Sequence, residues 1–458
     1  MPHLKNCARG PMAPLILLPL LLTGCGGTAA VLGSTAKVGT AHPLTSTISM
    51  IPLSGGAIGA VAVSAIARRA VVLVASRVFL VDTVRARLVA SPSLGFAPDA
   101  QRPALLALDE GRRRAYVASP GGPGAVPGLF AVDLISGRVL FGHPLSQRAG
   151  ASLDGVAVDR SRGTLFASLS VPDAQGAGHP QIVALDSAGW VTRRAPAPFS
   201  VGALVADEAR RRVLVAAPLD QELAGLDSRT LATVWRIPGL YPPQSTAYDA
   251  TRGRIWLLAP GGRATILSVA DGHVVATIPL NAPRPADWRQ GTDLTIDART
   301  GAAYVSWCTG ALESGLHCGL DRLDPGRGGT RATLTGLGGL LLGLDTAHDL
   351  SLTLRADGTV GAWRSGAAQA LASPVAVTGE IRSRPLITRS DTLQSVARAA
   401  VATPDGLLVA LDTILPLHND VTNASTTDGL VLITLTVSPP HGVSRSPLAR
   451  QAGRSRQP

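Results

Sequence analysis

LLALDEGRRRAYVAS (105–119) is the stretch of sequence that decides the fold, because close copies of it recur along the chain. GVAVDRSRGTLFASL (155–169) and ALVADEARRRVLVAA (203–217) are two of these copies. Each copy is an apolar run that ends at an aspartate, a short polar turn and a second apolar run. The aspartates are spaced at 50, 48, 42, 48 and 48 residues: Asp109, Asp159, Asp207, Asp249, Asp297 and Asp345. The chain is therefore built from repeats of roughly 48 residues.

A second pattern lies between these copies and supplies two more strands to most repeats. Examples are FLVDTVRARLVA (79–90), LFAVDLISGRVLFG (129–142) and IVALDSAGWVTRR (182–194). The apolar runs are short and rich in β-branched residues, and they lack the 3.6-residue period of a helix. Four-stranded units repeated every 40–50 residues predict an all-β protein, a β-propeller of four-stranded antiparallel blades.

The repeats resemble the YVTN-type repeat of bacterial surface-layer-like and quinoprotein-like propellers. The likeness covers about residues 47–437, and the tetrapeptide itself is degraded to AYVAS, LFASL, VLVAA, IWLLA and AYVSW. Eight copies of the first pattern predict eight blades, with seven as the alternative because members of the family more often have seven. TISMIPL (47–53) resembles the outer strand VVATIPL (274–280). We therefore expect this N-terminal strand to complete the last blade and close the ring.

The N-terminus has the pattern of an export signal. Lys5 and Arg9 precede APLILLPLLL (13–22), which is too short to span a bilayer as a mature helix. Leu22-Thr23-Gly24-Cys25 resembles the bacterial lipobox, which implies cleavage before Cys25 and a lipid on its thiol. The alternative is an ordinary secretory signal with an incidental cysteine. The predicted segments are a lipoprotein signal peptide (1–24), a flexible tether (25–46), the β-propeller (47–438) and a disordered basic tail (439–458).

Export places the protein at the cell membrane or outer membrane, facing the periplasm or the outside, where disulfides persist. Two of the four cysteines, Cys308 and Cys318, then remain unmodified. Their spacing does not match a zinc site. The sequence predicts a disulfide between them, with two free buried thiols as the alternative.

The basic charge is spread along the chain. The formal net charge is +11, but the body between the two terminal segments has only 35 basic against 31 acidic residues. Aromatic residues are 3% of the chain, which together with the dispersed charge argues against a nucleic-acid partner. The turns between the first and second strands (A–B turns) would form a ring of arginines that could contact anionic lipids or polymers, unless these arginines pair with adjacent carboxylates.

No enzyme motif is present: the sequence lacks G-x-S-x-G, HExxH and a phosphate-binding loop. Residues just before the innermost strands are expected to line the axial opening of the ring. They are Arg102, Asp154, Gln244, Asp293 and Arg398. Two carboxylates are a small set for Ca²⁺, which takes six to eight oxygen ligands. The sequence therefore predicts neither a metal nor a cofactor, and an enzymatic role stays uncertain.

Aromatic residues mark a candidate binding surface on two inter-blade loops. Tyr241 precedes the inner strand of one blade, and Trp288 with Arg289 precedes that of the next. Tyr, Trp and Arg dominate binding hot spots, although these rings could instead cover the blade tops. The sequence predicts a membrane-tethered, non-catalytic propeller that binds an envelope protein or ligand. The alternatives are a lactonase-like enzyme, a quinoprotein dehydrogenase-like redox subunit or a purely structural surface protein.

Overall fold

A computed structural model of the 458-residue chain shows a protein built entirely from β-strands over the residues that it describes. The described residues are 44–51, 53, 58–96, 104–121, 124–217, 221–239, 245–259, 262–280, 293–297, 299–309, 317–325, 329–335, 339–345, 350–355, 359–364, 369–370, 375–376, 394–403, 406–415 and 424–437. The predicted signal peptide, most of the predicted tether and the predicted tail lie outside them. Among the described residues, no helix is long and apolar enough to cross a membrane.

The described strands form eight antiparallel sheets, each numbered here as a blade in chain order. Blade 1 contains β2 (Ile58–Ser64), β3 (Arg69–Val74), β4 (Arg77–Asp82) and β5 (Arg87–Ala90). Blade 2 contains β6 (Leu105–Asp109), β7 (Arg114–Ser119), β8 (Gly128–Asp133) and β9 (Val139–Pro144). Blade 3 contains β10 (Ser152–Asp159), β11 (Thr164–Pro172), β12 (Gly178–Leu185) and β13 (Val191–Pro196). Blade 4 contains β14 (Ala203–Asp207), β15 (Arg212–Ala217), β16 (Glu222–Asp227) and β17 (Thr233–Ile237).

The second half of the chain continues the pattern. Blade 5 contains β18 (Ser245–Asp249), β19 (Arg254–Ala259), β20 (Arg263–Ser268) and β21 (Val274–Pro279). Blade 6 contains β22 (Asp293–Ile296), β23 (Ala303–Thr309), β24 (His317–Asp324) and β25 (Gly329–Thr335). Blade 7 contains β26 (Gly339–Asp345), β27 (Leu350–Arg355) and β28 (Thr359–Arg364), with two short outer strands, β29 (Gln369–Ala370) and β30 (Val375–Ala376), both paired with β28. Blade 8 contains β31 (Gln394–Thr403), β32 (Gly406–Leu415), β33 (Ala424–Val437) and β1 (Leu44–Ile51).

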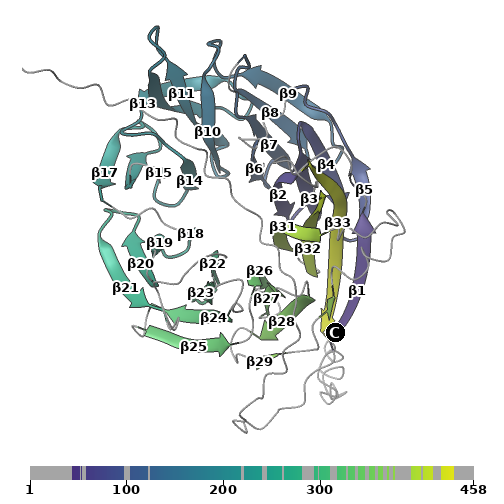
Figure 1. Ribbon diagram of the computed structural model, residues 1–458. Coiled ribbons are helices and arrows are strands. Elements are labelled where there is room, and N and C mark those ends of the chain that lie inside the picture. Colours follow the sequence, from purple (N-terminus) through teal and green to yellow (C-terminus); the bar gives the residue numbers. More distant parts are fainter. Residues whose placement is uncertain are drawn as a thin grey trace, which may run out of the picture.

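The blades are arranged in a ring around a common axis, with the first strand of each blade innermost (Figure 1). Contacts between innermost strands join β2 to β6, β6 to β10, β10 to β14, β18 to β22, β22 to β26, β26 to β31 and β31 back to β2. Blades 4 and 5 share a core cluster in which Leu214 and Trp235 pack with Ile255 and Leu267. These contacts close the ring, and the prediction of an all-β propeller with four-stranded antiparallel blades is confirmed.

Burial explains why the middle strands read as continuous apolar runs. Five of the six residues of β7 are buried, whereas none of the six residues of the outer strand β9 is. A middle strand has a neighbouring blade against each of its faces, so both sets of alternating side chains leave water. The core therefore lies between blades; in one cluster Phe166 and Ile182 of blade 3 pack with Val213 and Val215 of blade 4.

An N-terminal strand closes the ring, as the sequence predicted. β1 pairs with β33 without interruption, from Leu44 opposite Val437 to Ile51 opposite Leu430. The strand begins three residues before the predicted start at residue 47. Because the outer position of blade 8 is filled by a strand from the opposite end of the chain, the two ends of the repeat array are held together by backbone hydrogen bonds.

Candidate functional site

The axial strands contain three of the five residues that were predicted to line the axial opening. Asp154 lies in β10, Asp293 begins β22 and Arg398 lies in β31. Arg102 and Gln244 lie outside the described residues. Tyr241, Trp288 and Arg289, the predicted binding-loop residues, and Cys25 also lie outside them.

Asp154 is the extra residue of a β-bulge. Leu153 pairs with Leu169 and Gly155 with Ser168, so the register of the strand ladder shifts at Asp154. Its side chain is half-buried and accepts a hydrogen bond from the Ser152 hydroxyl at 3.2 Å. A bulge re-aims a side chain relative to the regular alternation of the strand.

The same bulge recurs in two other blades, at the same distance from the A–B turn. Arg398 lies between Ala397 and Ala399, which pair with Leu411 and Ala410. In blade 1 the bulge falls at Gly59, between the paired residues Ile58 and Ala60. Asp293 instead pairs regularly with Ser306. The structure thus places Asp154 and Arg398 at equivalent positions of their strands, and Asp293 one position nearer its turn.

No group of three or more His, Cys, Asp or Glu side chains that could hold a metal ion occurs among the described residues. The hydroxyl of Ser152 beside Asp154 is a hydrogen-bond donor, and one carboxylate with one hydroxyl falls far short of the ligand number of Ca²⁺. The described residues of the axial strands therefore include polar groups that can form hydrogen bonds, and no preformed metal centre occurs among them.

Cys308 and Cys318 lie directly opposite each other in the ladder between β23 and β24. Directly opposed residues of antiparallel strands have Cα atoms about 4.5–5.5 Å apart. Disulfides need a Cα separation of about 4.4–6.8 Å. The backbone register suits the predicted disulfide, which stays a prediction.

The turn face of the ring, where the A–B turns lie, carries a repeated pair of an aspartate and an arginine three residues later, which we call the Asp–Arg clasp. In each clasp the buried carboxylate accepts the backbone N–H of the arginine at 3.0–3.1 Å. It also forms an ion pair with the guanidinium of the same arginine at 2.8–3.3 Å. The four clasps are Asp109–Arg112, Asp159–Arg162, Asp207–Arg210 and Asp249–Arg252.

Each clasp also reaches the next blade. The guanidinium of Arg112 donates to the carbonyl of Arg160, one blade further on, at 2.7 Å. The corresponding bonds from Arg162, Arg210 and Arg252 are 3.4, 3.3 and 3.2 Å long. The clasp arginines therefore fasten the A–B turns of successive blades to one another. The D-x-x-R spacing that signals this arrangement is visible in the sequence, but the inter-blade bond was not predicted.

Gly163 shows how closely the turns approach each other. Its φ of +67° is a left-handed conformation that a glycine adopts without strain. The guanidinium of Arg112 occupies the space that a Cβ atom on this residue would need. Glycine thus avoids both backbone strain and a clash with Arg112 here, although arginines occupy the equivalent position of blades 1, 2 and 4 with φ of +50° to +56°: Arg68, Arg113 and Arg211.

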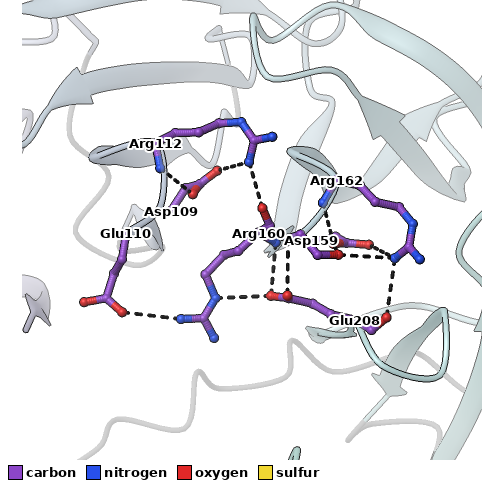
Figure 2. Close-up of polar contacts among 8 residues, drawn as sticks. Asp109, Glu110, Arg112, Asp159, Arg160, Arg162 and Glu208 are labelled. Carbon is purple, nitrogen blue, oxygen red and sulfur yellow. Dashed lines mark hydrogen bonds and ion pairs between the residues drawn. The ribbon is translucent and has the colours of Figure 1, made fainter. Parts of the chain in front are cut away.

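A second charge network joins three turns on the same face. Figure 2 shows Arg160 between two glutamates, with its Nε atom 3.2 Å from Glu208 and its Nη1 atom 3.5 Å from Glu110. Glu208 also accepts the backbone N–H groups of Arg160 and Ser161 at 3.0 and 3.2 Å. Most arginines of blades 2 to 5 that the sequence analysis placed in a basic ring are thus bound to carboxylates or carbonyls of neighbouring turns.

The pKa of Asp159 reflects this environment. Burial alone would raise the pKa of the Asp159 carboxyl, but hydrogen bonds from Ser161 and Arg162 outweigh it and hold the pKa below its ordinary value of 3.8. A general base needs a pKa near the working pH. A carboxylate that is held ionised and fully bonded therefore has a structural role, as expected for a turn aspartate.

Among blades 1 to 5, blade 1 is the one whose A–B turn lacks the clasp. Ser64 stands where the clasp aspartate is found in blades 2 to 5, and Ala67 stands in place of the arginine. The Ser64 hydroxyl still accepts the backbone N–H of Ala67, at 3.1 Å, so the turn keeps its shape without the ion pair. The buried carboxylate of this blade is Asp82, which pairs with Arg69 at 3.0 Å.

Comparisons with known proteins place this architecture among solved propellers. No protein-family model matches the chain, and no curated protein matches it in sequence. The structure of a quinohemoprotein alcohol dehydrogenase from Comamonas testosteroni is similar with a TM-score of 0.53 and 12% identity, covering 85% of this chain and 76% of that chain. The computationally designed Ika8 protein gives 0.52 and 14%, covering 84% and 99%. The dihydro-heme d1 dehydrogenase NirN gives 0.50 and 14%, covering 77% and 72%. At these identities the likeness shows the fold alone: the chain is an all-β protein with the β-propeller architecture.

Proposed function

We propose that the protein is a lipid-anchored, non-catalytic β-propeller that binds a protein partner in the bacterial cell envelope. The observation that carries this proposal is the sequence Leu22-Thr23-Gly24-Cys25, which ends an apolar stretch ahead of a closed ring. A rigid ring presents loops from many blades on one face, and such loops commonly carry binding residues. Tyr241, Trp288 and Arg289 are our candidates for the partner-binding surface, and a Cys308–Cys318 disulfide would stiffen its rim.

We base the non-catalytic assignment on the clasp carboxylates, which are bonded to backbone N–H groups and arginines. The second candidate function is that of a redox subunit or a lactonase-like enzyme. The observation that favours it is that two of the similar structures are named as dehydrogenases. A chromophore in the purified native protein would favour this second candidate.

The anchor is tested by Cys25→Ser, with Cys7→Ser as the matched control in the segment that we expect to be removed. Loss of the lipid should shift Cys25→Ser from the membrane fraction to a soluble or unprocessed form. Mass spectrometry of the mature N-terminus measures the lipid directly. Cys7→Ser should behave as the wild type, and a Cys25→Ser protein with unchanged mass and membrane retention contradicts the proposal.

The binding surface is tested by Trp288→Ala combined with Tyr241→Ala. The control is Trp190→Ala, because Trp190 is an exposed tryptophan in the turn between β12 and β13, away from the inter-blade loops. Cross-linking in intact cells should lose the partner only in the double variant, because removal of hot-spot aromatics weakens binding by roughly 2 kcal/mol or more each. Loss of the partner together with a lowered melting temperature would assign the two rings to packing instead.

A further inference from the structure

The N-terminal end of β1 lies on the turn face of the ring. In blade 8 the A–B turn connects Thr403 and Gly406, and Gly406 pairs with Thr434 of β33. Thr434 in turn pairs with Thr47 of β1. Thr47 is therefore level with the turn, and Leu44, the first residue of β1, lies at the turn face. β31 contacts β2, so this part of the turn face is beside blade 1.

Blade 1 displays apolar turn tips at this place. Ile66, in the A–B turn, is 69% exposed, and Val84, in the turn between β4 and β5, is 54% exposed. The two turns are joined by a hydrogen bond from the Thr83 N–H to the Arg68 carbonyl at 3.2 Å. Each of these two turns, which blade 1 holds together, thus carries an exposed aliphatic side chain.

Blade 2 extends this apolar corner. The Ile66 N–H donates to Glu110 of the neighbouring A–B turn at 3.4 Å, which ties blade 1 to blade 2 at this face. Ile135, in the turn between β8 and β9, is 43% exposed. We call Ile66, Val84 and Ile135 the apolar tips.

The charge of the same turns is strongly basic. The two turns of blade 1 carry four arginines, Arg68, Arg69, Arg85 and Arg87, against one aspartate, Asp82, a formal +3. Asp82 is buried and forms ion pairs with Arg69 at 3.0 Å and with Arg85 at 3.8 Å, and the Arg85 side chain is nevertheless 68% exposed. The corresponding turns of blade 3 are formally neutral, with Arg160 and Arg162 against Asp159 and Asp186. Excess positive charge is therefore concentrated where the apolar tips are.

We propose that this corner of the turn face, the apolar tips with the arginines of blade 1, docks on the surface of an anionic lipid bilayer. Short aliphatic tips can enter the headgroup boundary while arginines beside them contact lipid phosphates. Protein hot spots favour aromatic anchors, which the tips lack. The inference rests on the proposed function for its lipid anchor: Cys25 precedes Leu44 by 19 residues, a segment that spans at most about 65 Å. Leu44 lies at the face that we assign to the membrane.

The test uses the purified full-length native protein, reconstituted into vesicles, with a polarity-sensitive fluorophore attached at Val84→Cys. Unsubstituted protein carried through the same labelling measures the background from its own cysteines. The matched position is Val274→Cys, which is 57% exposed on the outer strand β21 of blade 5. Vesicles of phosphatidylglycerol with phosphatidylcholine are compared with vesicles of phosphatidylcholine alone, each containing a nitroxide-labelled lipid as quencher.

In the anionic vesicles the probe at residue 84 should shift its emission to shorter wavelength and lose most of its intensity to the nitroxide. The probe at residue 274 should change little. Arg85→Gln should weaken the quenching at residue 84, by about fivefold in the docking equilibrium, because one arginine near an anionic surface contributes about that factor. Ile66→Ser should weaken it as well, which separates docking from a purely electrostatic contact.

Two outcomes overturn the docking and leave the anchor intact. The first is equal quenching at residues 84 and 274, and the second is a protein that stays with the vesicles without any quenching at residue 84. Quenching that salt abolishes and that Ile66→Ser does not change reduces the contact to electrostatic attraction and overturns the docking of the apolar tips. Failure of the protein to associate with any vesicle contradicts both the anchor and the docking.

Discussion

The A–B turns of blades 1 and 3 have the same shape, but their charged side chains have different partners. In blade 3, Asp159 and Arg162 bind each other and the next blade, and Arg160 is bound between two glutamates. In blade 1, Ser64 preserves the turn with one hydrogen bond. Three of its arginines, Arg68, Arg85 and Arg87, and its aliphatic tips are exposed. All blades need the same turn shape in order to fold. A blade that keeps this shape without the charged pair of the other blades therefore has turn residues that are available for another role, such as binding.

The largest expected difference between the two blades is in the free energy of unfolding. Asp159→Ala removes a buried carboxylate and leaves the backbone N–H of Arg162 and the guanidinium without their acceptor. Because Arg162 is partly exposed, we expect a loss of about 2–3 kcal/mol, below the value for a fully buried pair. Ser64→Ala should cost at most about 1 kcal/mol, the usual value of one neutral hydrogen bond. Urea unfolding followed by circular dichroism measures both.

Equal losses from Asp159→Ala and Ser64→Ala would break this comparison, because the clasp would then contribute no more than a single hydrogen bond. Asp159→Ser serves as the matched variant, since it gives blade 3 the residue found in blade 1. It should recover part of the loss but not the inter-blade bond of Arg162.

A smaller effect on the free energy of unfolding is expected from substitution of the residue with positive φ in the A–B turns of blades 3 and 1. Gly163→Ala forces a side chain into the space filled by Arg112 at a positive φ, so a loss of about 1–2 kcal/mol is expected. Arg68 already adopts a φ of +50° in blade 1. Arg68→Gly should change stability by less than about 1 kcal/mol, because relief of the left-handed strain offsets the greater freedom of the unfolded chain. Thermal melts of the two variants decide this, and a larger loss for Arg68→Gly would show that its side chain contributes to packing.

The fold could be predicted from sequence because the strands and turns of each repeat are visible within that repeat. Asp159 signals a turn by its residue type, and the alternation of apolar runs with polar turns sets the four-stranded unit. The closing strand was predicted from its likeness to another outer strand, and it begins three residues and ends two residues earlier than predicted.

The contacts between blades could not be predicted in the same way. The bond from Arg112 to the Arg160 carbonyl depends on the distance between two sheets, which no single repeat encodes. The bulge at Asp154 was missed because one extra residue in a strand looks the same in sequence as a slightly longer strand. The binding residues predicted on the inter-blade loops lie outside the described residues and stay a prediction.

Ring closure also has a kinetic consequence. Leu44 pairs with Val437, 393 residues later in the sequence, whereas the strands of a hairpin such as β6 and β7 are separated by a turn of a few residues. Closing a loop of that length costs roughly 5 kcal/mol of chain entropy, against about 1–2 kcal/mol for a hairpin turn. Long-range pairing of this kind forms slowly. During synthesis β1 has to wait until β33 is complete, and until then both strands expose unpaired edges to neighbouring chains. The strand that completes the last blade is therefore the one whose late pairing exposes the nascent protein to misassembly for longest.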